Sequence, residues 1–354
     1  MNRARIAVIG AGWWAAQSHL PHLRMRQEAV EIVGVSRLGR DELQRVQERF
    51  AIPLAAEDFM EVLQRTKPDG VIISSPHVDH FDHAAAALNL GAHVMIEKPM
   101  TTTARDARKL VELARSAGRK IIIPHGWNFT HYTRKAASLY AAGAIGELRH
   151  ATLQMGSALT DLFGGDQLSE TAGHFFRPSS STWADPKRAG GYGWGQLVHA
   201  LGLFFRIVPL DPTEIYGRLG RSAVNVDYYD STIVTLGNGA TCVISGCATL
   251  PKHLGYHIDL RLFGDKGTML LDLERERLEV HQHSGERIVH PIGPGEGTAT
   301  YSITPAIDQF IDVCQGRDVE VDADGLVGLR SVKVLEGMYR SAEVGVPVAI
   351  SRDF

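Results

Sequence analysis

Short apolar runs alternate with amphipathic helical stretches over the first third of the chain. The apolar runs are residues 5–9, 31–35, 70–73, 93–96 and 120–123. Each has the length of a strand buried on both faces, and the stretches between them, such as Ala104 to Gly118, have the helical period. Strands that alternate with helices predict an α/β fold with a doubly wound parallel sheet over residues 1–124.

After residue 124 the pattern changes to strands that follow one another directly. Residues 231–236 and 240–244 flank Asn238-Gly239, a dipeptide typical of a tight hairpin. A second predicted hairpin joins residues 257–263 and 268–273. Residues 125–354 are therefore predicted to form an α+β domain with a large, mostly antiparallel, open-faced sheet. A loop is predicted over residues 285–300 and two closing helices over residues 301–314 and 328–342.

A glycine-rich turn follows the first predicted strand and has the form G-x-G-x-x-A. Gly10 permits the tight bend, Gly12 lets a pyrophosphate approach backbone N–H groups, and Ala15 lets the helix pack closely on the strand. Trp13 and Trp14 open that helix and are candidate cofactor contacts. The turn thus predicts a dinucleotide-binding Rossmann domain. The alternative is a simple turn at the end of a strand.

The residues after the second strand indicate which dinucleotide is bound. An acidic residue here would accept hydrogen bonds from a ribose 2′-hydroxyl and select NAD, whereas a hydroxyl with an arginine suits a 2′-phosphate. The chain has Ser36-Arg37, with Arg40 one helical turn further on. This combination predicts NADP as the preferred cofactor, with NAD possible. Alternatively, Arg37 stacks on adenine or caps a helix.

Three histidines follow the next strand at helical spacing, after Ser75 and Pro76. His77, His80 and His83, with Asp79 and Asp82 between them, resemble a zinc cluster. Histidine and aspartate are also common at the start of a helix, where they act as caps or are solvated. No metal is predicted, and His80, Ser75 and Pro76 are placed near the cofactor at the carboxyl end of the sheet.

Further motifs carry a resemblance to a known family. The segment S-P-H-V-D-H (75–80) is followed by G-A-H-V-M-I-E-K-P (91–99), and later segments at 139–146 and 324–347 agree as well. Together with the glycine turn, they resemble the Gfo/Idh/MocA family of nicotinamide-dependent oxidoreductases over nearly the whole chain. The resemblance implies that Lys98 lies beside the nicotinamide and the substrate hydroxyl and that Asn128 lies near the nicotinamide. The proline that matches Pro99 is often cis in members of the family.

Lys98 is the first candidate catalytic residue, as a proton acceptor or relay. An ordinary lysine has a pKa of about 10.4 and is a poor base at neutral pH, so a pocket of low dielectric or a neighbouring cation must lower it. Glu97 is expected to orient Lys98. The alternative is that Lys98 only clamps substrate and ribose through hydrogen bonds.

The second catalytic segment departs from the family pattern. Inositol-type members carry D-x-G-x-H, which places an aspartate and a histidine four residues apart on one helix face. Here His199 matches the histidine, but Gly195 stands in the position of the aspartate. His199 is predicted to be the general base, with Lys98 polarising or relaying, and Gln196 or Tyr192 is the candidate for the missing hydrogen bond. The alternative is that His199 is a core histidine.

Further candidates for substrate binding come from the predicted second domain. They are residues 127–129, Tyr132, His174 and Arg177. For the last three, ordinary loop packing is an equal alternative.

Composition narrows the choice of partners and compartment. The chain has 354 residues, 44% of them hydrophobic, which is enough for two cores. A net charge of −3 and a pI near 6.6 provide no basic face for nucleic acid. The three cysteines have neither metal spacing nor the even number of a disulfide framework, so a reduced, cytoplasmic protein is predicted. No signal peptide or membrane-spanning run is found, and pairing through the open sheet predicts a homodimer or homotetramer.

Three functions fit these observations. The first is an NADP-preferring oxidoreductase that acts on a secondary hydroxyl of a sugar, sugar derivative or cyclitol. The second is a glycoside-cleaving enzyme that oxidises a ring carbon transiently and retains its cofactor. The third is an NADPH-binding sensor without turnover, which the presence of both Lys98 and His199 argues against.

Overall fold

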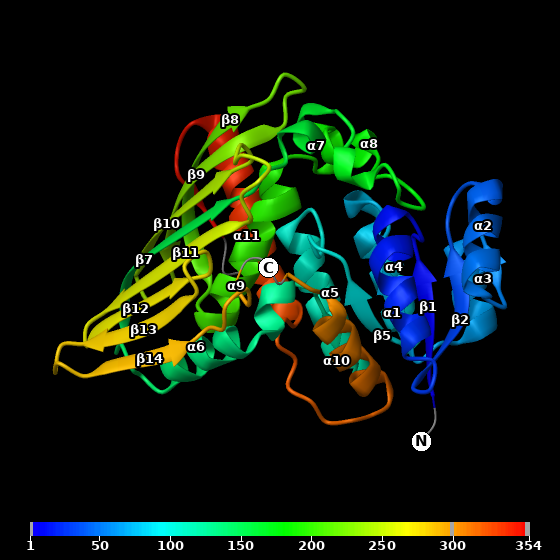
Figure 1. Cartoon of the computed structure of the whole chain (residues 1–354), viewed down its shortest axis with the longest axis horizontal. Helices are drawn as coiled ribbons and strands as arrows, with labels where there is room; N and C mark the ends of the chain where they lie inside the picture. The colour runs from blue at the N-terminus through cyan, green and yellow to red at the C-terminus, as the bar shows by residue number, and fades with distance from the viewer. Residues whose placement is uncertain (1–2, 298–300, 351–354) are drawn as a thin grey trace. The chain divides into compact units, whose positions relative to one another are not determined.

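The chain folds into two compact units in the computed structural model, which describes residues 3–297 and 301–350 (Figure 1). Of the described residues, the first unit contains those up to Pro124 together with Gln167–Thr182 and Ile303–Leu329. The second unit contains the rest. The sequence predicted one domain boundary, after residue 124. In the structure, Gln167–Thr182 and Ile303–Leu329 also belong to the first unit.

The segment Ile303–Leu329 joins the first unit through its backbone and its helix. Ile123 N–H donates to the carbonyl of Ala323 at 2.8 Å. Helix α10 (Thr304–Cys314) packs against strands β1 (Ala4–Ile9) and β5 (His93–Ile96). These contacts join residues far apart in the sequence, so the apolar pattern alone did not reveal them.

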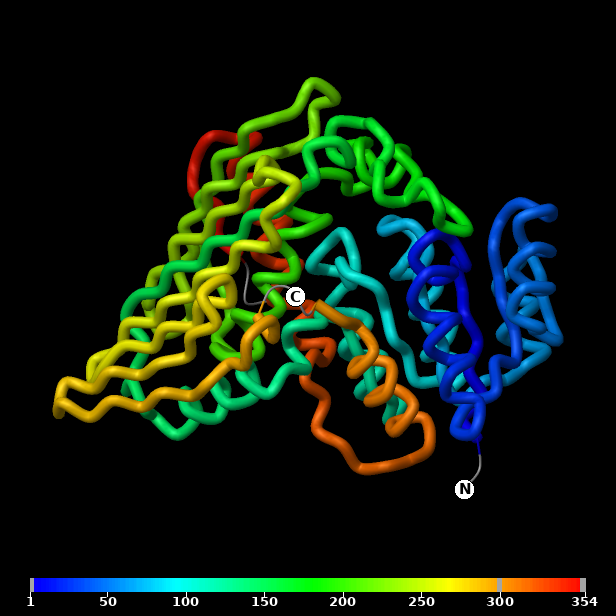
Figure 2. Tube along the Cα trace, viewed as in Figure 1, coloured from blue at the N-terminus to red at the C-terminus, as the bar shows by residue number. Residues whose placement is uncertain are grey.

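The first unit is built on a six-stranded parallel sheet, as predicted. Its strand order is β3-β2-β1-β4-β5-β6. Figure 2 shows the first 124 residues of this unit as the blue to cyan part of the Cα trace. The order reverses between β1 and β4, and ligands bind at such a switch point outside the carboxyl ends of the strands. The remaining bounds are β2 Val30–Ser36, β3 Ala55–Ala56, β4 Gly70–Ile73 and β6 Ile121–Ile122.

Local sequence fixes the helices of the first unit. In α5 (Ala104–Ala117), the Thr103 side chain accepts a hydrogen bond from Asp106 N–H at the start, and Gly118 ends the helix in the left-handed conformation with φ 62°. The other helices are α1 Leu20–Met25, α2 Arg40–Phe50, α3 Phe59–Thr66 and α4 His80–Asn89.

The second unit is built on a nine-stranded sheet of order β14-β13-β12-β11-β7-β10-β9-β8-β15. All its neighbours are antiparallel except β7 and β10, and both predicted hairpins are present as β9–β10 and β11–β12. The first five strand bounds are β7 Leu148–Gly156, β8 Pro212–Arg221, β9 Asp227–Leu236, β10 Thr241–Cys247 and β11 His257–Gly264. The others are β12 Gly267–Asp272, β13 Arg277–Gln282, β14 Arg287–Pro291 and β15 Val348–Ala349.

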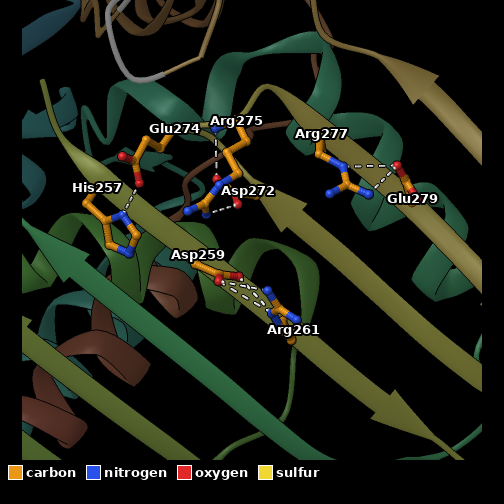
Figure 3. A network of polar contacts seen from close by, with 8 residues as sticks. All are labelled: His257, Asp259, Arg261, Asp272, Glu274, Arg275, Arg277 and Glu279. Atoms are coloured by element: carbon orange, nitrogen blue, oxygen red, sulfur yellow. Dashed lines mark hydrogen bonds and ion pairs between the residues drawn. The ribbon is translucent and has the colours of Figure 1, made fainter.

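Within this unit the two faces of the sheet differ in character. Helices lie against one face: α6 His131–Ala141, α9 Val198–Ile207 and the second half of α11 Gly325–Val344 (Figure 1). The opposite face carries charged pairs, among them Asp259 with Arg261 within β11 and Arg277 with Glu279 within β13 (Figure 3). Alternation of apolar and polar residues along each strand produces this division. The short helices α7 and α8 are Thr160–Gly164 and Ser180–Trp183.

Two details differ from the sequence prediction. The loop predicted over residues 285–300 contains the edge strand β14, because residues 287–291 pair with β13; residues 298–300 lie outside the described residues. The first closing helix begins at Thr304 instead of residue 301. In the described part of the chain, no helix combines the length and apolarity needed to cross a membrane.

Candidate cofactor and active site

The glycine turn at the end of β1 has the geometry of a phosphate cradle. Gly10 has φ +80°, and a Cβ on it would lie 2.3 Å from the Ser75 backbone nitrogen, so only glycine fits there. In contrast, a Cβ on Gly12 would meet nothing nearer than Arg37 Nη1 at 3.9 Å. Open space therefore faces the backbone at the start of the helix, where a pyrophosphate binds. The residues present fit a dinucleotide.

The helix after the turn begins with the two tryptophans and continues into a π-helical turn, η1 (Ala15–His19). Trp13 Nε1 donates to His174 Nδ1 at 2.8 Å, and Trp14 Nε1 donates to Glu97 Oε1 at 2.9 Å. Single π turns inside helices are frequent at functional sites. The two indoles thus tie the glycine turn to residues from two other parts of the first unit.

Arg37 lies over the glycine turn, at the end of β2. Its Nη1 donates to the carbonyl of Ala11 at 3.2 Å, and its guanidinium lies 4.2 Å from the ring centre of Phe176. Burial lowers the pKa of Arg37, and nearby Glu42 offsets part of that effect. Arg37 Nε is buried without a hydrogen-bond partner. The hydroxyl of Ser36 donates to the carbonyl of Glu57. Arg37, and not Ser36, therefore has a side-chain donor available for a ligand after β2.

Glu97 is a buried carboxylate at the end of β5. Its Oε1 accepts hydrogen bonds from Trp14 and from His19, whose Nε2 lies 2.9 Å away. Burial alone would raise the pKa of Glu97, but the hydrogen bond from His19 and the positive charges nearby hold the pKa below its usual value. Glu97 is therefore ionised beside Lys98, whose backbone N–H donates to Glu97 Oε2 at 3.3 Å.

The pKa of Lys98 is lowered, which is the condition set for a lysine that acts as a base near neutral pH. Burial disfavours its ammonium and lowers its pKa to about 8, although Glu97 partly opposes the shift. The peptide bond between Lys98 and Pro99 is cis, as the family resemblance implied. An ammonium with this pKa is mostly charged at pH 7 and is a stronger hydrogen-bond donor than an ordinary lysine.

His80 lies between the two loops that follow β4 and β5. Its Nδ1 lies 2.8 Å from the carbonyl of Pro99, and its Nε2 lies 2.8 Å from the carbonyl of Ser75. Burial lowers the pKa of His80, and both carbonyls oppose that shift. The neutral ring carries one N–H, which donates to one of the two carbonyls, so His80 lies between the loop of Lys98 and the Ser75-Pro76 turn.

The histidines near Pro76 do not converge as metal ligands would. His83 Nδ1 lies 2.9 Å from Ser75 Oγ, while the ring of His77 makes an edge contact with His80 at 6.0 Å. Among residues 3–297 and 301–350, no group of three histidine, cysteine, aspartate or glutamate side chains is arranged to hold a metal ion.

The segment Gln167–Thr182 brings two predicted substrate residues into the first unit. His174 accepts the indole N–H of Trp13, while Arg177 hydrogen-bonds Gln167 and the Thr171 carbonyl within the same segment. Phe176 stacks on Arg37. Phe175 packs in the same way on two arginines of α2, Arg45 and Arg49, at 4.9 and 4.8 Å. The segment therefore contacts both the glycine turn and the arginine that follows β2.

In the second unit, His199 lies in α9, directly after a second π-helical turn, η6 (Gly193–Leu197). Its ring, 5% exposed, makes edge contacts with His125, Trp127 and Tyr301 at 5.7, 5.8 and 5.1 Å. The Tyr301 hydroxyl lies 3.3 Å from His199 Nδ1. His199 is thus a nearly buried histidine in an aromatic cluster, and the sequence did not reveal the contact with Tyr301.

The ring of Phe163 leaves no room for a side chain at position 195. A Cβ on Gly195 would lie 2.7 Å from Phe163 Cε1 and Cζ, and 3.3 Å from the Trp183 ring. A side chain at position 195 would therefore overlap the ring of Phe163. No sequence signal links Phe163 to Gly195, because the two positions belong to different elements and meet only through packing.

The two candidates for the missing hydrogen bond lie in or beside η6. The Tyr192 hydroxyl donates to the carbonyl of Met155 at 3.2 Å, and burial raises the pKa of Tyr192 far above its usual value. Gln196 is 9% exposed within the π turn. Tyr192 thus keeps its proton and binds the backbone of β7.

The first residues of the second unit include buried polar groups. Asn128 Nδ2 donates to the carbonyl of Gly202 at 2.9 Å, which fixes the short helical turn Gly126–Phe129 against α9. Trp127 Nε1 and the Tyr132 hydroxyl are buried without hydrogen-bond partners. Burial raises the pKa of Tyr132 to about 12. Buried donors without partners are uncommon and are expected to bind a ligand or water.

The fold and the glycine turn define a dinucleotide-binding protein with a Rossmann domain, and comparison with known proteins identifies its family. A family model described as "Oxidoreductase family, NAD-binding Rossmann fold" matches residues 4–125, and the "GFO/IDH/MocA C-terminal domain" matches residues 133–270. The oxidoreductase YdgJ of Escherichia coli, itself uncharacterised, is 30% identical over 83% of this chain and 73% of its own length. The chain belongs to the GFO/IDH/MocA family of oxidoreductases.

Other relatives match over shorter regions. D-glucoside 3-dehydrogenase of Escherichia coli is 31% identical over 41% of this chain and 41% of its own length. The chain spans 57% of a cyclohexadiene dehydrogenase of Comamonas testosteroni at 26% identity, so it covers about half the length of these two curated relatives.

Solved structures match the whole chain. A levoglucosan dehydrogenase in complex with NADH and levoglucosan has a TM-score of 0.78 at 18% identity, with 99% of this chain and 100% of that chain covered, which shows the common fold.

Proposed function

We propose that this protein is an NAD(P)-dependent dehydrogenase that moves hydride between the nicotinamide and a secondary hydroxyl of a sugar, sugar derivative or cyclitol. The observation that carries the proposal is Lys98, a lysine whose pKa is lowered to about 8 in the unit that contains the glycine turn. Relatives named D-glucoside 3-dehydrogenase and dTDP-3,4-didehydro-2,6-dideoxy-α-D-glucose 3-reductase support a sugar-like substrate.

A bound nicotinamide dinucleotide supplies the hydride acceptor or donor. The backbone at Gly10 and Gly12 would hold the pyrophosphate, with Trp13 and Trp14 beside it. Ser75, Pro76, His80, Glu97 and Asn128 are proposed to shape or support the nicotinamide half of the site. Arg37 binds the adenosine ribose.

Lys98 and His199 are proposed to perform the acid-base chemistry. During oxidation, His199 takes the proton of the substrate hydroxyl as the hydride leaves the same carbon, and the C–O bond becomes a carbonyl. The Lys98 ammonium donates a hydrogen bond to the oxygen on which negative charge develops. Tyr132 and Gln196 are proposed to bind further substrate hydroxyls, because the Tyr132 hydroxyl is a buried group without a partner.

The experiment that tests this function is cofactor reduction by the purified enzyme. NADP⁺ and NAD⁺ are offered with a panel of aldoses, anhydrosugars, glycosides and cyclitols, and absorbance of the reduced nicotinamide is followed. Reduction that depends on Lys98 identifies a dehydrogenase and its substrate class. No reduction with any substrate, in enzyme that binds cofactor, contradicts the proposal.

A glycoside-cleaving enzyme that retains its cofactor is a second candidate, favoured by the segment Gln167–Thr182. His174 and Phe176 of this segment contact Trp13 and Arg37 beside the glycine turn. A segment in this position would cover a bound dinucleotide and slow its release. Such an enzyme would purify with nicotinamide that survives extensive dialysis and would release the aglycone of a nitrophenyl glycoside. Release without net cofactor reduction would distinguish it from the dehydrogenase.

We propose that Arg37 makes NADP the preferred cofactor. Its Nε is a buried donor without a partner, and an arginine matches a phosphate in geometry and charge. Changing Arg37 to Gln is expected to weaken NADPH binding by about 10- to 100-fold and to leave NADH binding nearly unchanged. Fluorescence titration measures both affinities.

Arg115→Gln, on the exposed side of α5, is the matched control because it removes the same charge elsewhere in the first unit. An unchanged ratio of the two affinities in Arg37→Gln would remove the argument for NADP.

The outward face of the second-unit sheet is the proposed contact in a homodimer or homotetramer. Ile233 and Val243 lie directly opposite each other on β9 and β10 and are 49% and 44% exposed. Exposed apolar side chains on a flat sheet favour pairing with a second copy. Ile233→Asp with Val243→Asp is expected to shift the mass seen by light scattering towards the monomer. A mass equal to that of the wild type would place the interface elsewhere.

A further inference from the structure

The helix of His199 has glycine, and no carboxylate, four residues before the histidine. Gly195, four residues earlier, has no side chain, and the Phe163 ring fills the space in which one would extend. Tyr192 directs its hydroxyl to the carbonyl of Met155. A general base must have its ring orientation and tautomer fixed by a hydrogen bond to the other ring nitrogen. A hydrogen bond from another element of the second unit can fix the His199 ring in the same way.

Tyr301 occupies that position. Its hydroxyl lies 3.3 Å from His199 Nδ1, although the two residues are 102 positions apart in the sequence. The two rings meet edge to face, with centroids 5.1 Å apart and an interplanar angle of 82°. The contact is thus directed at one particular nitrogen of the imidazole.

The Tyr301 ring is held in place by the turn Gly126–Phe129. A Cβ on Gly126 would lie 2.7 Å from Tyr301 Cε2 and 2.6 Å from the carbonyl of Ser302, so the absence of a side chain at Gly126 makes room for the tyrosine. The Trp127 ring packs against Tyr301 at 4.7 Å. Close packing of this kind limits the rotamers available to the tyrosine and so fixes the position of its hydroxyl.

We infer that Tyr301 is the positioning residue of His199. The Nδ1–H of His199 donates to the tyrosine oxygen, which leaves the Nε2 lone pair to take the proton of the substrate hydroxyl as hydride leaves the carbon. The inference rests on the proposed function and deepens it. A neutral phenol orients the imidazole without placing a negative charge beside it, whereas the aspartate of the family pattern would add one.

The test begins with a measurement that needs no substrate. In the full-length protein labelled with ¹⁵N-histidine, NMR reports the tautomer of each imidazole, and His199→Ala identifies the His199 signals. Tyr301→Phe keeps the packed ring and removes the hydroxyl. It is expected to shift His199 from the Nδ1–H tautomer towards the Nε2–H tautomer. His199 signals that do not change in Tyr301→Phe overturn the inference, whether or not turnover is found.

Tyr256→Phe is the matched control for the NMR measurement. Tyr256 belongs to the same aromatic cluster, with its ring 5.2 Å from Trp127 and 6.4 Å from Tyr301. Its substitution also removes one hydroxyl and is expected to leave the His199 tautomer as in the wild type. A tautomer shift in Tyr256→Phe equal to that in Tyr301→Phe would mean that the cluster as a whole, and not the Tyr301 hydroxyl, sets the tautomer, which overturns the inference.

Kinetics then test the catalytic consequence on a substrate identified by the panel. Tyr301→Phe is expected to lower kcat by about 10-fold, with KM nearly unchanged, because the hydroxyl orients the base and binds no substrate. The pH dependence that His199→Ala removes should also move in Tyr301→Phe. A wild-type kcat and pH profile in Tyr301→Phe overturn the positioning role. Absence of wild-type turnover contradicts the proposed function instead, because the NMR result is independent of it.

Discussion

Changing Lys98 to Met is expected to lower kcat for hydride transfer by about 10³-fold while cofactor binding is retained. The methionine keeps much of the volume of the lysine stem but cannot donate a hydrogen bond to the substrate oxygen. The glycine turn and Arg37 lie in other segments, so their proposed contacts with the dinucleotide are expected to remain. Stopped-flow measurement of nicotinamide absorbance gives the rate, and fluorescence titration gives the affinity. Turnover at the wild-type rate would remove Lys98 from the chemistry.

The variant Lys98→Arg tests whether the positive charge of Lys98 is needed for activity. With a pKa of about 8, the ammonium loses its proton as the pH rises through 8, so wild-type kcat/KM for oxidation is expected to fall above that pH. Arginine keeps its charge over this range. Lys98→Arg should therefore show a lower rate and no decline between pH 7 and 9. The same alkaline decline in both proteins would assign it to another group.

Changing Gly195 to Asp is expected to destabilise the protein by about 3 kcal/mol or more. A Cβ at position 195 would lie 2.7 Å from the buried ring of Phe163, and the carboxylate would be placed among aromatic rings. Urea unfolding followed by circular dichroism measures the loss. A variant as stable as the wild type would show that Phe163 moves aside easily.

Gly173→Asp is the matched control, because a Cβ on Gly173 meets nothing within 4 Å. Its unfolding free energy is expected to stay within about 0.5 kcal/mol of the wild type. Phe163→Ala combined with Gly195→Asp tests the clash directly. The pair should be less destabilising than the sum of the single changes, because the alanine opens the space that the aspartate needs.

Both helices that carry the family motifs contain a π turn beside the candidate chemistry. The first, Ala15–His19, follows the glycine turn and places His19 against Glu97. The second, Gly193–Leu197, directly precedes the helix of His199. An extra residue in one helical turn rotates the side chains after it, so the i, i+4 spacing read from the sequence does not fix which groups meet. The spacing of Gly195 and His199 in the sequence therefore does not by itself show that the two positions share one helix face.

The sequence by itself determined the elements whose signals are local. The apolar runs predicted the parallel strands of the first unit, Asn238-Gly239 predicted the hairpin β9–β10, and the glycine turn predicted the phosphate cradle. Each of these depends on residues that are close in the chain, because the backbone conformation of a turn or strand follows from its own side chains. The burial that lowers the pKa of Lys98 was required by its predicted role and is present.

Only the tertiary structure decided which distant segments meet. The segment Gln167–Thr182 contacts the glycine turn of the first unit, Phe163 fills the space beside Gly195, and the Tyr301 hydroxyl reaches His199. None of these contacts leaves a periodic signal in the sequence, because packing selects a partner by shape after the elements have formed. The identity of the candidate catalytic residues thus came from the chain itself, and their supporting contacts came from the fold.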